Sequence, residues 1–121
     1  MSRSAIARQY LKHLEDGDME AVIALFSETG TVASPLYGNK LASEFYRLLQ
    51  NDTNASKLKL KGIYDNNDTN TLALHFNYHW TLKTAKEVNF DVVDIIAFDD
   101  TLKIKHLQII YDTVVSRNLI S

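Results

Sequence analysis

The stretch that decides the fold is Phe90-Asp-Val-Val-Asp-Ile-Ile-Ala-Phe98. It is rich in β-branched and aromatic side chains, which favour a strand. Strand side chains alternate between two faces, so the face that carries Asp94 otherwise holds large apolar groups: Phe90, Val92, Ile96 and Phe98. A carboxyl group among apolar side chains is costly unless a specific interaction requires it. Asp94 is therefore the first candidate for a functional residue.

Apolar residues recur at helical spacing in three segments that precede residue 51. Ser4, Asp18 and Asn39 are the candidate N-caps of these helices. Gly17 is the candidate end of the first helix, and Thr29-Gly30 should end the second. A short extended piece is expected over residues 31–34, and a polar loop over residues 51–54.

The second half of the chain changes to alternating spacing, which predicts strands over residues 56–64, 71–83, 90–98 and 102–115. Three helices followed by an antiparallel meander predict one α+β domain over residues 1–121, with the helices packed on one face of a curved antiparallel sheet. The space between the two layers is a natural pocket for a small hydrophobic molecule. We expect its walls to be formed by Leu74, Phe76, Tyr78, Trp80, Val92, Ile96, Leu107, Ile109 and Tyr111. A filled core is the alternative reading of the same residues.

Composition excludes several classes of site and partner. The chain of 121 residues has a formal net charge of -2 and no cysteine, so disulfides, thiolate metal sites and a cysteine nucleophile are excluded. Nothing marks a nucleic-acid or membrane-surface binder, which would usually carry a basic patch. Residues 1–5 lack the apolar stretch of a signal peptide and no apolar run is long enough to span a bilayer, so we expect a cytoplasmic protein.

The four histidines do not predict a metal site. His75 and His79 share a strand face, but four residues of strand separate them by roughly 13 Å, which is too far to share one zinc ion. They also face away from the expected pocket. We expect no metal and no cofactor. The outer face that carries these histidines also carries Val93, Ile95, Ala97 and Ile110, and no remaining element could cover it, which implies a partner.

Several motifs together resemble a known superfamily. They are the segment Tyr10–Phe26 with Gly17-Asp18 at its centre, Thr31-Val-Ala-Ser-Pro35, Glu44-Phe-Tyr46, and Asp91–Phe98. Over nearly its whole length the chain resembles the nuclear transport factor 2-like superfamily, and within it the ketosteroid isomerase and SnoaL-like branch. The resemblance implies a cystatin-like cone of helices and curved sheet. It also implies a homodimer formed through the outer sheet face.

The resemblance assigns roles to four residues. In ketosteroid isomerases a tyrosine and a neutral aspartic acid hold the oxyanion of the substrate, and a second carboxylate moves the proton. By position, Tyr10 and Asp94 match the oxyanion donors, Tyr46 matches a supporting tyrosine, and Ser34 matches the base. A serine cannot take up a proton near neutral pH without a base of its own. Asp112 is the nearest other carboxylate, and strand parity predicts that it points away from the pocket.

Three functions remain open on the sequence. The first is a binding protein for a small hydrophobic carbonyl compound or phenol that keeps the oxyanion-type pair and lacks the base. The second is an isomerase or cyclase of the ketosteroid isomerase or SnoaL type that uses a different base. The third is a dimeric scaffold whose cavity is filled. The absence of a carboxylate at Ser34 favours the first over a steroid isomerase.

Overall fold

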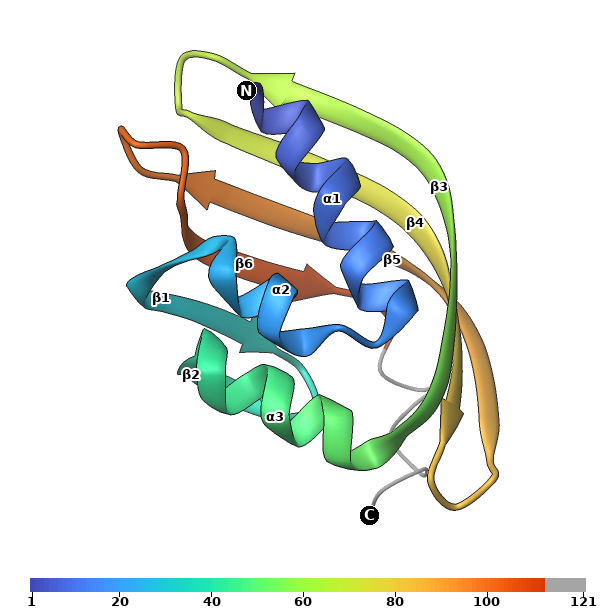
Figure 1. The fold of residues 1–121 in the computed structure, drawn as a ribbon. Coiled ribbons are helices and arrows are strands. Elements are labelled where there is room, and N and C mark those ends of the chain that lie inside the picture. The colour runs from blue at the N-terminus through green and yellow to red at the C-terminus, as the bar shows by residue number, and fades with distance from the viewer. Residues whose placement is uncertain (113–121) are drawn as a thin grey trace.

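One curved sheet wraps around three helices in the computed structural model, which describes residues 1–112 (Figure 1). The helices are α1 (Arg3–Asp16), α2 (Met19–Ala24) and α3 (Ala42–Asp52). The strands are β1 (Phe26–Ser34), β2 (Gly38–Leu41), β3 (Thr53–Asn66), β4 (Thr71–Leu82), β5 (Glu87–Phe98) and β6 (Ile104–Ile110). The helices lie on the concave side of the sheet, so the fold is α+β with a mixed sheet.

The sheet has the strand order β2-β1-β6-β5-β4-β3. The expectation of a wholly antiparallel sheet is wrong, because β1 pairs in parallel with β6. The chain leaves β1 through β2 and α3 and crosses to the far edge of the sheet, and the meander then returns β6 to the side of β1. Pairing between the first and last strands depends on this long connection, which local spacing does not reveal.

The start of the first helix lies earlier than expected, whereas its end and the next cap are confirmed. Ser2, rather than Ser4, is the N-cap of α1, and its hydroxyl accepts a hydrogen bond from the backbone N–H of Ala5. Gly17 ends α1 in the left-handed conformation, with a φ of 73°. The Asp18 side chain caps α2 through the N–H of Ala21.

Two other helix boundaries differ from the sequence expectation. The second helix was expected to continue to Thr29, but β1 begins at Phe26 because that residue pairs with Ile104 of β6. Asn39, expected to cap the third helix, lies in β2, and Leu41 precedes α3 without a side-chain cap. The expected loop over residues 51–54 is absent, since α3 continues directly into β3.

The strands also extend beyond or fall short of their expected limits. Strand β3 starts at Thr53 and continues to Asn66, and β5 already begins at Glu87. Strand β6 covers Ile104–Ile110, because Leu102 has a φ of 65° and belongs to the preceding turn. The predicted final residues of that strand, 113–115, lie outside the described residues.

The inner face of the sheet forms the core with the helices. Every second residue of β4 and β5 is buried, as alternation predicts. Among the described residues, Asp94 is the one Asp, Glu, Lys or Arg that is buried, and its exposed fraction is 1%. The sequence expectation of an acid on the apolar face of this strand is confirmed.

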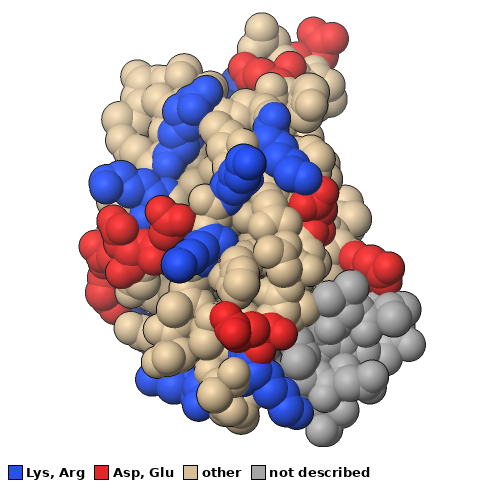
Figure 2. Space-filling view, turned by 90° about the vertical axis from the view of Figure 1, so that its right-hand side faces the viewer, with Lys and Arg blue, Asp and Glu red and all other residues tan. Residues whose placement is uncertain are grey.

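The outer face of the sheet is polar over much of its area. Lys61 pairs with Asp91 at 2.9 Å and His79 pairs with Glu87 at 2.9 Å. Figure 2 shows the side of the molecule on which β3 and β4 lie, where side chains of both charge signs are interspersed. Among residues 1–112, no helix is both long and apolar enough to cross a bilayer.

Candidate functional site

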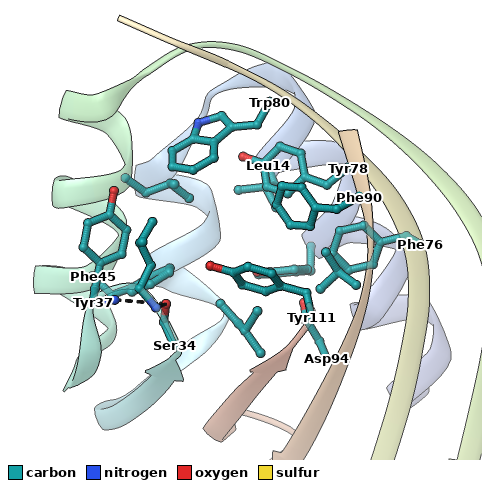
Figure 3. A pocket seen from close by; sticks show the side chains of 15 residues that line it. Leu14, Ser34, Tyr37, Phe45, Phe76, Tyr78, Trp80, Phe90, Asp94 and Tyr111 are labelled. Atoms are coloured by element: carbon teal, nitrogen blue, oxygen red, sulfur yellow. Dashed lines mark hydrogen bonds between the residues drawn. The ribbon is translucent and has the colours of Figure 1, made fainter. Parts of the chain in front are cut away.

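A narrow pocket lies between the helices and the inner face of the sheet (Figure 3). Its free volume in this structure is about 50 Å³. An engineered cavity that binds benzene has roughly 150 Å³, so a ring-sized ligand would require the wall side chains to move apart. Its walls come from α1, α3, the end of β1 with the turn that follows, and strands β4, β5 and β6. The lining side chains are Tyr10, Leu14, Ser34, Leu36, Tyr37, Phe45, Leu49, Phe76, Tyr78, Trp80, Phe90, Val92, Asp94, Ile109 and Tyr111.

Asp94 supplies the one acidic side chain of this lining. Strand β5 places it opposite Leu74 on one side and Ile109 on the other. Burial raises the pKa of its carboxyl well above the usual value of an aspartic acid. Its Oδ1 atom is buried and has no hydrogen-bond partner among residues 1–112. An unpaired buried oxygen is costly, so this atom marks the place where a ligand could bond.

Tyr10 and Tyr46 form a hydrogen-bonded pair next to this acid. Helix α1 carries Tyr10 and α3 carries Tyr46, and their hydroxyl oxygens lie 2.7 Å apart. Tyr10 lines the pocket, whereas Tyr46 is completely buried behind it. Burial raises the pKa of Tyr10, and the nearby Tyr46 and Asp94 raise it further. Asp94 lies close enough to both tyrosines to contribute to the raised pKa of each.

Ser34 belongs to the pocket lining, and its side-chain oxygen stabilises the turn that follows β1. Its Oγ accepts hydrogen bonds from the backbone N–H groups of Leu36 at 3.1 Å and Tyr37 at 3.3 Å (Figure 3). The hydroxyl of Tyr37 in turn donates to Asp52 at the end of α3. Ser34 therefore shapes the segment that closes one side of the pocket. Asp112 is exposed and is not part of the lining.

Aromatic rings form most of the wall. Phe90 stacks near Tyr78, with ring centroids 5.7 Å apart, and near Tyr111, at 4.7 Å. In Figure 3 the rings of Tyr37 and Phe45 lie on the side of the pocket opposite to those of Tyr78 and Phe90. Two polar ends of this wall bond to β3, since Tyr78 Oη lies 2.9 Å from Ser56 Oγ and Trp80 Nε1 donates to Thr53 Oγ1 at 2.8 Å. Burial raises the pKa of Tyr78 to about 12.

Part of the predicted wall is in the lining and part is not. The structure places Phe76, Tyr78, Trp80, Val92, Ile109 and Tyr111 in the lining. Leu74, Ile96 and Leu107 do not line the pocket, and each is completely buried in the core. These three share the inner face, but they lie level with or beyond Asp94, where the layers close together. Alternation predicts which face of the sheet a side chain occupies. It does not predict whether that side chain reaches the pocket or lies in the closed part of the core.

Six lining residues were not among the predicted ones: Leu14, Leu36, Tyr37, Phe45, Leu49 and Phe90. Phe90 could have been found, because it shares the strand face of Val92 and Asp94. Phe45 and Leu49 lie on an apolar helical stripe. Such a stripe predicts that both side chains are buried, but it does not predict which residues they contact. Leu36 and Tyr37 lie in a turn and carry no such pattern.

No group of three or more potential metal-ligating side chains (His, Cys, Asp or Glu) comes together in the part of the chain that the structure describes. His75 and His79 lie on the outer face and approach different acids, Asp91 at 3.6 Å and Glu87 at 2.9 Å. His106 bonds through Nδ1 to Thr31 at 2.8 Å. The pocket lining contains no histidine.

Comparison with known proteins identifies a family and a shared fold. A family model described as the SnoaL-like domain matches residues 7–107. No curated protein matches the chain. Among solved structures, a nuclear transport factor 2-like protein of unknown function from Burkholderia pseudomallei is 16% identical, with a TM-score of 0.85 over 100% of this chain and 99% of that one.

Two further structures have a described ligand or activity. TerC, crystallised with polyporic acid, is 17% identical, with a TM-score of 0.82 over 98% of this chain and 97% of its own. SalBIII, described as an epoxide hydrolase/cyclase-like enzyme in pyran ring formation in the polyether salinomycin, is 15% identical, with a TM-score of 0.80 over 93% of this chain and 92% of its own. At these identities the similarity is one of fold alone.

Proposed function

Because the chain belongs to the SnoaL-like domain family, we propose that it binds a small hydrophobic carbonyl compound or phenol in the pocket between its helices and its sheet. The observation that carries the proposal is the buried Asp94 Oδ1 in the pocket lining, which has no partner among residues 1–112. Chains seldom leave a buried oxygen unpaired. A ligand oxygen beside Asp94 would provide the missing hydrogen bond.

In this proposal, Asp94 and Tyr10 act together on the ligand oxygen. The raised pKa of Asp94 favours its neutral form, which donates a hydrogen bond. Tyr46 can donate to the Tyr10 oxygen, which frees the Tyr10 proton for the ligand. The aromatic wall then holds the apolar part of the molecule by burial.

The lining contains no second carboxylate that could act as a base, which favours binding over steroid-type isomerisation. Isomerisation needs a carboxylate that takes a proton from the carbon beside the carbonyl group. Asp94 is the one Asp or Glu side chain in the lining, and its role as a neutral donor excludes a simultaneous role as that base. The Ser34 oxygen already accepts two backbone hydrogen bonds.

The second candidate is an enzyme that uses Asp94 as a general acid. A buried neutral carboxyl group next to a pocket is the arrangement needed to protonate an oxygen that leaves or opens. The description of SalBIII as epoxide hydrolase/cyclase-like is consistent with such chemistry on this fold. The third candidate, a scaffold with a filled cavity, is favoured by the small free volume of about 50 Å³.

We also propose that two copies of the chain pair through the outer sheet face. Ile110 is 47% exposed there, and Val93, Ile95 and Ala97 are only partly covered within one chain. Pairing would remove this apolar strip from water. His75 and His79 would lie at the edge of that interface, each next to an acid of its own chain.

The test of the binding proposal uses Trp80, the one tryptophan of the chain, which lines the pocket and reports on it by fluorescence. Titration with 3-methylphenol should change this emission with saturation, and toluene, which lacks the oxygen, should bind at least about tenfold more weakly. A heteronuclear NMR titration locates the site. If neither compound binds, the pocket is closed and the scaffold function stands instead.

A further inference from the structure

We infer that the side chain of Tyr37 is the gate of the pocket. Held by Asp52, it closes the mouth of the empty pocket, and it swings outward when a ring-sized ligand binds. The inference rests on the proposed binding function and deepens it, because it identifies the residue that controls access to the site.

The exposure of the lining residues locates the mouth of the pocket. In the described chain, the lining residues that are partly exposed are Ser34, Leu36, Tyr37, Ile109 and Tyr111. The first three belong to the end of β1 and the turn that follows, and the other two to β6 and the residues after it. The other lining side chains are buried. A ligand therefore enters between this turn and the end of β6.

Most of the wall cannot move without breaking several contacts at once. The deep wall consists of buried side chains of β4 and β5, and Tyr78 and Trp80 are also hydrogen-bonded to β3. On one side of the mouth, the ring of Tyr111 lies 4.7 Å from that of Phe90, which in turn contacts Tyr78. The free volume of about 50 Å³ nevertheless requires some part of the wall to give way to a ring.

Tyr37 is attached in a simpler way, on the side of the pocket opposite to Phe90 (Figure 3). Its hydroxyl donates a hydrogen bond to the Asp52 carboxylate, and its ring meets that of Phe45 edge-on, with centroids 5.6 Å apart. Burial, together with the bond to Asp52 and its charge, raises the pKa of Tyr37, so the hydroxyl keeps its proton at neutral pH. The backbone oxygen of Asp52 accepts from the N–H of Lys83 at 2.9 Å, which anchors the acceptor.

The backbone of the turn is held separately from the Tyr37 ring. Ser34 Oγ accepts from the N–H groups of Leu36 and Tyr37, and these bonds do not involve the ring. A change of the Tyr37 side-chain rotamer therefore breaks one side-chain hydrogen bond and one ring contact and leaves the turn in place. Because Tyr37 is already partly exposed, such a change carries its ring into water and vacates space at the mouth.

The closed position of the ring competes with the ligand. If the bound molecule takes the space that the ring vacates, the apparent affinity is reduced by the fraction of molecules in which the gate is open. Removal of the Tyr37–Asp52 bond raises that fraction and should strengthen binding. A residue that merely supports the shape of the pocket would have the opposite effect when it is changed.

The first test measures affinity for 3-methylphenol by the fluorescence of Trp80. Tyr37→Phe and Asp52→Ala each remove the bond and should strengthen binding about threefold to tenfold. The double variant should bind no more tightly than either single variant, because both changes remove the same bond. The control is Tyr64→Phe, which removes a hydroxyl from a tyrosine that is 63% exposed and outside the lining, and it should keep the native affinity. A circular dichroism melt verifies that each variant is folded.

The second test follows the ring itself by fluorine NMR of the chain labelled with 3-fluorotyrosine. The chain has six tyrosines, and the signal of Tyr37 is identified by its absence from Tyr37→Phe. Saturation with 3-methylphenol should increase the difference between the shifts of this signal in H₂O and D₂O, because the ring turns towards water. An unchanged difference at saturation would mean that the gate stays closed over the ligand.

The outcomes separate the gate from the function on which it rests. If 3-methylphenol binds the native chain and both gate variants with equal affinity, or binds the variants more weakly, the gate is wrong while the binding function stands. If it binds neither the native chain nor any variant, the binding function fails and the gate fails with it. Stronger, non-additive binding by Tyr37→Phe and Asp52→Ala, with greater exposure of Tyr37 in the complex, supports the inference.

Discussion

The hydroxyl oxygens of Tyr10 and Tyr46 lie 2.7 Å apart, with Tyr10 in the pocket lining and Tyr46 completely buried behind it. This arrangement makes Tyr46 a positioning residue in the proposed site, because it reaches the pocket only through Tyr10. When Tyr46 donates, the Tyr10 proton is directed away from it and is available to a ligand oxygen.

Replacement of Tyr46 by phenylalanine tests this dependence. Tyr46→Phe removes the donor to Tyr10 and should weaken binding of 3-methylphenol about threefold to tenfold. Tyr10→Phe should weaken binding at least as much. In a double-mutant cycle, the second substitution should add little to Tyr10→Phe, because Tyr46 acts through Tyr10. Fully additive effects would show that Tyr46 affects the ligand independently of Tyr10.

The burial of Asp94 predicts a pH dependence of stability. The folded pKa is raised above the value of about 3.9 that an aspartic acid has in an unfolded chain. Between these two pKa values the folded chain holds a proton that the unfolded chain has lost, so the free energy of unfolding falls as the pH rises.

The variant Asp94→Asn removes this titration and keeps the shape of the side chain. The free energy of unfolding of this variant minus that of the native chain should be smallest near pH 4. It should increase towards pH 7.5, because the native chain loses stability over this range. Urea denaturation at both pH values measures the difference. A difference that does not change with pH would mean that Asp94 titrates alike in the folded and unfolded chains.

Ser34→Asp tests the proposal that isomerisation requires a carboxylate at this position. An aspartate at this position can accept the same hydrogen bonds from Leu36 and Tyr37, and it adds a carboxylate to the rim of the pocket. The native chain should not convert 3-cyclohexenone to 2-cyclohexenone above background, and Ser34→Asp should do so measurably by absorbance. The base would take the proton between the carbonyl and the double bond and return it to the far alkene carbon.

The control for this experiment is Ser34→Ala, which removes the oxygen that holds the turn and supplies no base. It should show no isomerisation. Turnover by the native chain would contradict the binding-only proposal and would require a base other than Ser34.

The outer face predicts the oligomeric state. Sedimentation velocity of the native chain should show a dimer, and Ile110→Lys should shift it towards monomer, because it places charges against each other in the apolar strip. Leu48→Lys is the matched control, since Leu48 is 37% exposed on α3, on the helical side of the sheet. A monomeric native chain, or dissociation by Leu48→Lys alone, would place the contact elsewhere.

Local sequence patterns were sufficient to predict part of this structure. Period-two alternation placed Asp94 on the buried face, and the left-handed preference of glycine placed the end of α1 at Gly17. Asp18 met its expected role as a cap. Each of these features depends on residues within a few positions in the chain, which is why the sequence alone reveals them.

Other features depend on contacts between distant segments. The parallel pairing of β1 with β6 joins residues such as Val32 and Leu107, and it turned the expected end of the second helix into a strand. The depth of Leu74 and Ile96 depends on where the layers converge. The turn role of the Ser34 oxygen depends on backbone geometry after Pro35. No spacing rule within one segment predicts such features.

The most direct measurement of the central claim, that Asp94 is retained for a ligand at a cost to stability, is the variant Asp94→Leu assayed for both properties. Without ligand, its free energy of unfolding at pH 7 should exceed that of the native chain by about 1–3 kcal/mol, because a buried unpaired oxygen is removed. Its affinity for 3-methylphenol should fall at least about tenfold. Leu72→Val, a buried control on the same sheet face outside the lining, should lose about 1 kcal/mol and keep its affinity. A less stable Asp94→Leu that still binds the phenol with native affinity would contradict the account.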